Sequence, residues 1–229
     1  MNPADEKRAA AEAAVLLVED GMTVGLGTGS TVAFLLPALV RRQVSIRCVA
    51  TSVATESAAR ALGLRVEAFG TEGLDRLDRL DRLDRLDIAI DGADQIDPDG
   101  WLVKGGGGAH TREKIVAAAA DRFVVIADST KTVASIDAPI PVEVLAFGLA
   151  STLRREPHLR VRANTPPSPD GGIIADWIGP IGDSPTSLAA RLAAIAGIVE
   201  HGLFPPSLVR DVFVANGGDV IHRRISASR

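Results

Sequence analysis

Short apolar runs alternate with helix-like segments through the first part of the chain. Five such runs, TVGLG, SIRCVA, LRVEAF, LDIAID and RFVVIAD, lie between Thr23 and Asp128 and have the length and composition of buried strands. An opening helix is predicted for residues 4–19, and further helices for residues 30–42 and 51–63. Alternation at this spacing predicts an α/β fold, with a Rossmann-like parallel sheet and helices on both faces.

The pattern changes after about Ile136. A strand bracketed by prolines, APIPVEVLAFG, is followed by shorter helical and extended segments, which are typical of a smaller α+β domain. The final RDVFVANGGDVIHRR is predicted to return to the first sheet. The domain boundaries expected from sequence are therefore an α/β catalytic domain at 1–135 and 208–229, and a smaller domain at 136–207.

A repeated triplet, LDRLDRLDRLDRLD, runs from Leu74 to Asp87. Each three-residue step turns an α-helix by about 300°, so its leucines wind around the axis and form no apolar stripe. We interpret the repeat as a lengthened connection into the fourth strand. The alternative is a helix that binds a partner.

The glycine-rich turn from Gly25 to Thr31 lies between a predicted strand and helix, where free N–H groups and the helix dipole favour an anion. A dinucleotide fingerprint is excluded, since Ser30 occupies the third glycine position and no acid follows the second strand. A Walker motif is excluded too. The hydroxyls of Thr28, Ser30 and Thr31 suit one phosphate or a small oxyanion; the alternative is a tight turn with no ligand.

The segment DGADQIDPDGWLVKGGGGAHTREK gathers the polar side chains expected of an active site. Asp91 ends a hydrophobic strand and Asp94 follows three residues later, at the edge of an open α/β sheet where ligands bind. Lys104 precedes the bare backbone of Gly105–Gly108, and Glu113 falls in the first turn of the next helix. Two acids, a lysine and a third acid predict proton transfer on a small phosphorylated molecule. Alternatively, Asp91 and Asp94 only form turns.

Lysine is scarce in this chain, with four lysines among 25 basic residues. Lysine is a compact ammonium that titrates when buried, so each position is a candidate for chemistry: Lys7, Lys104, Lys114 and Lys131. Drift in composition is the alternative explanation.

Several partners and locations are not expected. A net charge of −4 gives no reason to expect nucleic acid, and no apolar run is long enough to cross a membrane. No cluster of histidine and cysteine suggests a metal, so His110 is interpreted as incidental. Cys48 stands alone in an apolar run, and residues 1–12 lack a signal-peptide core. A cytoplasmic location is predicted.

Six motifs in this order resemble the ribose-5-phosphate isomerase A family: GLGTGSTV, TSVATESAARALGL, DIAIDGADQID, KGGGGAHTREKIV, IADSTKTV and PIPVEV. The resemblance extends through Val144 and beyond it covers only the general layout. It implies interconversion of ribose 5-phosphate and ribulose 5-phosphate without metal or organic cofactor. By resemblance, Glu113 is the base that moves the proton between C1 and C2. Asp91, Asp94 and Lys104 would serve ring opening and proton traffic at O1 and O2.

The resemblance also implies how a sugar phosphate is bound. Contacts to the phosphate and hydroxyls map to Thr28, Gly29, Ser30, Thr31 and Lys131, and Lys7 reaches in from the first helix. Gly105 and Gly106 carry no side chain, so the substrate can approach their backbone closely. The expected partner is this small molecule alone, and the family implies a homodimer or larger homo-oligomer.

The chain departs from the family pattern at Gln95, where an acid is usual, and at His110, where an apolar residue is common. The triplet repeat is a third departure. Three alternatives therefore stay open: a deaminase of amino sugar phosphates, a phosphosugar sensor without turnover, and an isomerase-like protein disabled by its repeat. About twenty residues precede the first strand, so no DNA-binding unit of a sensor is expected there.

Overall fold

The computed structural model describes residues 2–69 and 85–225. The described residues form two compact units. The first draws on Met1–Gly92, Ile115–Ser129 and Val209–Ser226, and the second on Ala93–Lys114 and Thr130–Leu208. The segments 93–114 and 130–135 therefore cluster with the smaller unit, whereas the division expected from sequence put them with the larger one.

The first unit is built on a seven-stranded sheet in the order β14-β13-β7-β4-β1-β2-β3. The six strands from β13 across the sheet to β3 are all parallel to one another, and the edge strand β14 pairs antiparallel with β13. Its elements are α1 (Pro3–Ala14), η1 (Val15–Leu17), β1 (Thr23–Leu26), α2 (Val32–Arg41), β2 (Arg47–Ala50), α3 (Val53–Ala61), β3 (Arg65–Val66), β4 (Ile88–Asp91), β7 (Phe123–Asp128), β13 (Asp211–Asn216) and β14 (Asp219–Arg224), together with the second half of α4 (His110–Ala119). The predicted α/β class and the return of the last strands to this sheet are confirmed.

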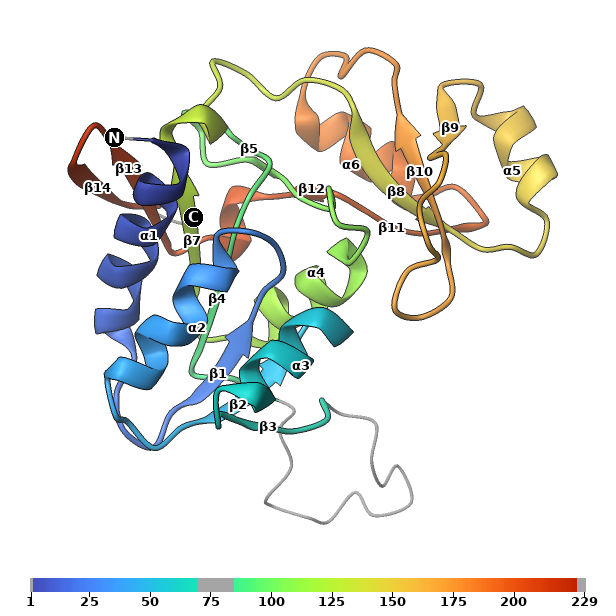
Figure 1. The fold of residues 1–229 in the computed structure, drawn as a ribbon. Helices are drawn as coiled ribbons and strands as arrows, with labels where there is room; N and C mark the ends of the chain where they lie inside the picture. Colours follow the sequence, from blue (N-terminus) through green and yellow to red (C-terminus); the bar gives the residue numbers. More distant parts are fainter. Residues whose placement is uncertain (1, 70–84, 226–229) are drawn as a thin grey trace. The chain divides into compact units, whose positions relative to one another are not determined.

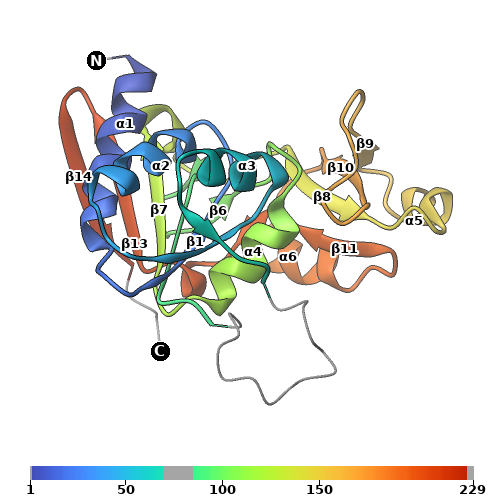
Figure 2. The same ribbon diagram turned by 60° about the horizontal axis from the view of Figure 1, so that its bottom comes forward.

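Helices cover both faces of this sheet, as predicted. On one face, α1 and α2 pack over Val24, Leu26, Ile90 and Ile126 in a single apolar core (Figure 1). On the other face, a Cβ added to Gly25 would lie 2.5 Å from Val116 of α4, so this glycine lets the helix approach the sheet closely. Figure 2 shows α1, α2 and α3 along one side of the strands and α4 on the other.

Side-chain caps define where several helices begin. The Asn2 side chain accepts hydrogen bonds from the amides of Ala4 and Asp5 and starts α1, with Pro3 in the first position. Ser52 accepts from the amide of Thr55 and starts α3 in the same way. The opening helix is shorter than predicted, since a 3₁₀ turn replaces it after Ala14.

Most of the triplet repeat lies outside the described residues, which include only its last three residues, 85–87. Leu86 is 1% exposed, so this leucine is part of the packed interior. Arg85 pairs with Asp121 at 2.7 Å, and the Asp87 carboxylate accepts hydrogen bonds from the amide and hydroxyl of Thr23. These contacts set the chain at the start of β4.

The second unit contains two antiparallel sheets, in the orders β11-β8-β10-β9 and β12-β6-β5. Its interior is formed by Trp177, Ile140, Leu188 and their neighbours. The elements are β5 (Gln95–Ile96), β6 (Leu102–Val103), the first half of α4, η2 (Ser129–Lys131), β8 (Ile140–Val144), α5 (Leu149–Arg155), β9 (Leu159–Val161), β10 (Ile173–Trp177), α6 (Pro185–Ala193), β11 (Ile198–His201), β12 (Leu203–Phe204) and η3 (Pro206–Leu208). The predicted smaller α+β unit is confirmed, although the short strands β5, β6 and β12 were not predicted. None of the described helices is long and apolar enough to span a membrane.

Candidate functional site

The candidate residues of the first unit lie where β1 and β4 end. These strands are parallel neighbours, and the amide of Gly27 donates to the carbonyl of Ile90 at 3.0 Å, just beyond β1. Asp91 is the last residue of β4. The predicted position of this acid, at the carboxyl end of a parallel strand and beside the glycine turn, is confirmed.

Backbone amides hold the Asp91 carboxylate. Its Oδ1 accepts from the amide of Thr28 at 3.0 Å and from that of Gly92 at 2.7 Å, and the residue is 3% exposed. A Cβ added to Gly27 would lie 1.9 Å from this carboxyl group. Glycine is therefore required at position 27, because any side chain would displace Asp91.

The turn that follows β1 presents small residues to solvent. Gly29 has φ of +110°, a backbone conformation that favours glycine, and its carbonyl accepts the amide of Ala33 at 3.1 Å. Gly29 and Ser30 are exposed, whereas Thr31 is 8% exposed. The Thr28 hydroxyl hydrogen-bonds that of Thr51 at 2.7 Å, which anchors the turn to the end of β2. The arrangement can offer amides and hydroxyls to a small anion.

Lys7 of α1 adds a cation to this turn. Its Nζ donates to Ser30 Oγ at 2.9 Å and lies 3.8 Å from Asp128 Oδ2. Asp128 is 1% exposed and is the last residue of β7. Asp128 was not among the predicted site residues, although its place at the end of a buried parallel strand, like that of Asp91, could have indicated it.

In the second unit, Asp94 lies against the run of glycines. Its own amide donates to the carbonyl of Val103 at 2.7 Å, and its Oδ2 accepts from the amide of Gly106 at 2.8 Å. A Cβ on Gly106 would lie 2.9 Å from Asp94 Oδ1, closer than a side chain normally approaches. Asp94 is exposed, so its carboxylate is fixed on one side and open to solvent.

Lys104 and Glu113 form a buried ion pair. Lys104 Nζ lies 3.2 Å from Glu113 Oε2, and the side chains are 3% and 4% exposed. Lys104 follows β6, and Glu113 lies in the first turn of α4, as predicted. Burial weakens solvent screening, so each charge acts strongly on the other and on a reacting group beside them. A carboxylate beside an ammonium can take and return a proton while the ammonium stabilises the negative charge that develops.

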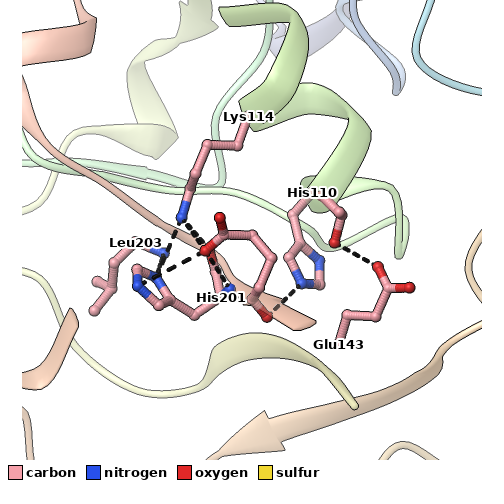
Figure 3. A network of polar contacts seen from close by, with 7 residues as sticks. His110, Lys114, Glu143, His201 and Leu203 are labelled. Atoms are coloured by element: carbon pink, nitrogen blue, oxygen red, sulfur yellow. Dashed lines mark hydrogen bonds and ion pairs between the residues drawn. The ribbon is translucent and has the colours of Figure 1, made fainter. Parts of the chain in front are cut away.

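A half-buried lysine, Lys114, lies next to Glu113 in α4 and over the same aromatic ring as Lys104. Lys104 Nζ lies 5.6 Å from the centre of the Phe204 ring, and Lys114 Nζ lies 5.0 Å from it. Lys114 also donates to Glu200 at 2.7 Å and to the carbonyl of His201 at 2.6 Å (Figure 3). Burial lowers the pKa of Lys114, although the nearby Glu200 carboxylate acts to raise it.

His110 is a buried neutral side chain of this network. It is 0% exposed, its Nε2 lies 3.4 Å from the carbonyl of Glu200, and burial lowers its pKa to about 4. A Cβ on Gly105 would lie 2.6 Å from His110 Nδ1, so the ring packs directly under the first glycine of the run. His110, interpreted from the sequence as incidental to metal binding, is a packed core residue.

The remaining positions have simple local roles. The Gln95 side chain makes two hydrogen bonds to the backbone of Asp137. Its Nε2 donates to the carbonyl and its Oε1 accepts from the amide, both at 2.9 Å, so a neutral side chain fits here. Lys131 ends η2 and is half-buried. Within residues 2–69 and 85–225, no group of three or more His, Cys, Asp or Glu side chains is arranged to hold a metal.

Comparisons with known proteins agree across the chain. The family model described as "Ribose 5-phosphate isomerase A (phosphoriboisomerase A)" matches residues 47–219. A ribose-5-phosphate isomerase A of Caulobacter sp. (strain K31) is 42% identical over 218 residues, which cover 89% of this chain and 91% of that protein. The crystal structure of ribose 5 phosphate isomerase A from Neisseria gonorrhoeae superposes with a TM-score of 0.87 at 28% identity and covers 98% of both chains. A structure of D-ribose-5-phosphate isomerase in complex with phospho-erythronic acid gives a TM-score of 0.85 at 30% identity and covers 98% of this chain and 100% of that one.

Proposed function

The chain belongs to the ribose 5-phosphate isomerase A family, and on this premise we propose that it interconverts D-ribose 5-phosphate and D-ribulose 5-phosphate through an enediolate. The observation that carries the proposal is the buried pair of Lys104 and Glu113, with Nζ and Oε2 3.2 Å apart. The reaction needs a base that acts on two neighbouring carbons and a cation for the charge formed between them, and this pair supplies both.

Glu113 is proposed as the base. Its carboxylate removes the proton from C2 of the open-chain aldose, and the electron pair moves to give an enediolate with its charge on oxygen. Glu113 then returns a proton to C1, while one proton passes from O2 to O1, so atoms and charge balance. The Lys104 ammonium stabilises the enediolate, since a fixed charge in a dry site is effective against developing negative charge.

Asp91 and Asp94 are proposed to serve ring opening and the proton transfers at oxygen. Both carboxylates are oriented by hydrogen bonds from backbone amides. Asp94 is exposed and can exchange protons with water. A carboxylate that is oriented on one side and solvated on the other suits general acid and base work.

The sugar phosphate is proposed to contact the small-residue turn and the lysines: Thr28, Gly29, Ser30, Thr31, Lys7, Lys131, Gly105 and Gly106. The exposed Gly29 and Ser30, together with the Lys7 ammonium 2.9 Å from Ser30, favour an anion. The related isomerase in complex with phospho-erythronic acid supports this proposal, because that ligand joins a phosphate to a carboxylate. The cytoplasmic location and the homodimer or larger homo-oligomer stay predictions, and light scattering in solution tests the second.

The test is turnover of ribose 5-phosphate by the purified protein in D₂O, followed by NMR. We expect ribulose 5-phosphate to form with deuterium at C1, since an enediolate route exposes the moving proton to exchange. Glu113→Gln should lose turnover and exchange together. A Glu113→Gln protein with normal turnover would rule out the assigned base, and a wild-type protein without turnover would rule out the activity.

A further inference from the structure

Arg162 is a residue of the second unit that neither the motifs nor the proposed chemistry uses. It follows β9. Its guanidinium donates two parallel hydrogen bonds to the carboxylate of Asp176 in β10, from Nε to Oδ2 at 2.9 Å and from Nη2 to Oδ1 at 2.5 Å. Two parallel bonds fix the plane of a guanidinium as well as its position. The third nitrogen, Nη1, is therefore held in one direction.

Nη1 of Arg162 points at the run of glycines. It donates to the carbonyl of Gly106 at 2.9 Å and to that of Gly105 at 3.2 Å. A guanidinium can bind a carboxylate with one edge and carbonyls with the remaining donors, whereas a lysine ammonium has no such fixed fork. Arg162 thus ties the glycine run to the β-sheet of this unit.

The glycine run benefits from an outside anchor because it has no side chains of its own. Gly106 and Gly107 are exposed, and glycine loses more conformational freedom on ordering than any other residue. One bond within the run, from the amide of Gly108 to the carbonyl of Gly105 at 3.0 Å, closes a turn. Arg162 adds two more hydrogen bonds, one at the first residue of that turn and one at the second.

One peptide group connects Arg162 to Asp94. The carbonyl of Gly105 and the amide N–H of Gly106 belong to the same planar unit and point in opposite directions. Arg162 donates to that carbonyl, and that amide donates to Asp94 Oδ2 at 2.8 Å. A donor at the carbonyl polarises the peptide and strengthens its N–H as a donor, so the two bonds support each other.

We propose that Arg162, held by Asp176, is a positioning residue that fixes the Gly105–Gly106 peptide and through it the carboxylate of Asp94. This inference rests on the proposed function, in which Asp94 takes part in proton transfer. Arg162 acts through the peptide and does not itself touch the reacting atoms. The charge of Asp94 also contributes to raising the pKa of Arg162, after the larger effect of its hydrogen bond with Asp176.

The experiment compares Arg162→Ala, Arg162→Lys and Asp176→Asn with a matched control, Arg160→Ala. Arg160 lies in β9, two residues before Arg162, and is exposed, and its side chain donates to the carbonyls of Pro157 and Leu159. A misplaced catalytic group can reduce a rate by about 10²-fold, so we expect Arg162→Ala to lower kcat roughly 10- to 100-fold with KM nearly unchanged. Arg162→Lys should recover only a small part, and Arg160→Ala should behave as wild type.

Chemical rescue separates positioning from folding. The Arg162 side chain is 21% exposed, so free guanidinium can enter the space that Arg162→Ala leaves. Millimolar guanidinium should restore kcat of Arg162→Ala several-fold and leave Asp176→Asn unchanged. If Arg162→Ala does not fold, the kcat of Asp176→Asn decides instead. That variant keeps the guanidinium but no longer holds it in a fixed orientation.

Hydrogen exchange at the Gly106 amide, measured by NMR, is the readout that needs no turnover. The amide should exchange at least tenfold faster in Arg162→Ala than in wild type or Arg160→Ala. Unchanged exchange together with a kcat within twofold of the control would overturn the proposal. Failure of the wild-type protein to turn over ribose 5-phosphate would instead overturn the proposed function, and the exchange rates would still decide whether Arg162 holds this peptide.

Discussion

The two units hold their candidate carboxylates by different means. In the first unit, Asp91 is bound by backbone amides of Thr28 and Gly92, and the absence of a side chain at Gly27 makes room for it. In the second unit, Glu113 Oε2 lies 3.2 Å from Lys104 Nζ, and both side chains are buried. Amide dipoles orient a charge by geometry, whereas a buried ammonium acts through its own charge.

The difference predicts different sensitivities. An arrangement made by backbone geometry should be damaged by an added methyl group and should tolerate changes of charge elsewhere. An arrangement made by paired charges should be damaged when one charge is removed, even if the shape is kept. Substitutions that separate shape from charge therefore test whether the contrast is real.

The largest effect is expected for Glu113→Gln. The amide keeps the shape but cannot take a proton, and a general base contributes about 10²–10⁴-fold, so turnover should fall by that factor. Binding of a phosphosugar, measured by calorimetry, should be retained. Glu156→Gln is the control, because Glu156 is also buried and bound by an arginine, Arg191, at 2.7 Å. Equal losses in both variants would show that any buried acid matters and that Glu113 is not special.

Lys104→Met should follow, with kcat reduced about 10²–10³-fold, as for removal of a group that stabilises transition-state charge. It also leaves Glu113 buried without this cation, which typically costs about 3–5 kcal/mol of stability. Lys131→Met should mainly raise KM, because Lys131 is proposed to contact the phosphate. Steady-state kinetics and thermal unfolding of both variants decide the matter. Identical changes of kcat and KM in the two would mean that one lysine is misassigned.

Gly27→Ala tests the first unit. The new Cβ would lie 1.9 Å from the Asp91 carboxyl group, so Asp91 must move, and a displacement of about 1 Å can reduce a rate roughly 10²-fold. Gly92→Ala is the matched control, since its Cβ would lie at an ordinary 3.9 Å from its nearest neighbours. If Gly27→Ala turns over substrate as fast as Gly92→Ala, the claim that backbone geometry holds Asp91 in its working position is wrong.

The smallest effect concerns acid stability and leaves activity at neutral pH unchanged. Burial lowers the pKa of His110 to about 4, from 6.5 in the unfolded chain. The neutral ring therefore contributes stability that is present above pH 6.5 and is lost as the pH falls toward 4. At pH 5 this loss is roughly 2 kcal/mol for one such group. His110→Leu should flatten the fall of the thermal midpoint between pH 7 and pH 5, and a fall as steep as in wild type would contradict the assignment.

Local pattern accounts for what the sequence predicted correctly. Parallel strands in a covered sheet are continuous apolar runs, so β1, β4 and β7 could be located, and with them Asp91 at a strand end. The first turn of a helix is equally local, which is why the position of Glu113 was correct. Charge-bearing motifs close together in the chain thus revealed both candidate carboxylates.

Contacts made across long stretches of sequence were not predictable. Strands β5, β6 and β12 have two residues each, too few for any periodicity to appear. Arg162 reaches the Gly106 carbonyl across 56 residues and is one of many arginines, so nothing local marks it. The burial of His110 likewise depends on the backbone of Glu200, which only the folded chain supplies.

The pairing of β6 with β12 has a consequence for how the protein is made. The amide of Lys104 donates to the carbonyl of Gly202, and β12 follows immediately. Translation proceeds at about 5–20 residues per second, so the ribosome adds this partner roughly 5–20 s after Lys104 itself. During that interval the nascent chain carries Lys104 without the carbonyl that binds its amide and without the partner of β6. Catalytic competence should therefore arise late in synthesis, and chains truncated before Gly202 should be inactive even where the first helices and strands have already formed.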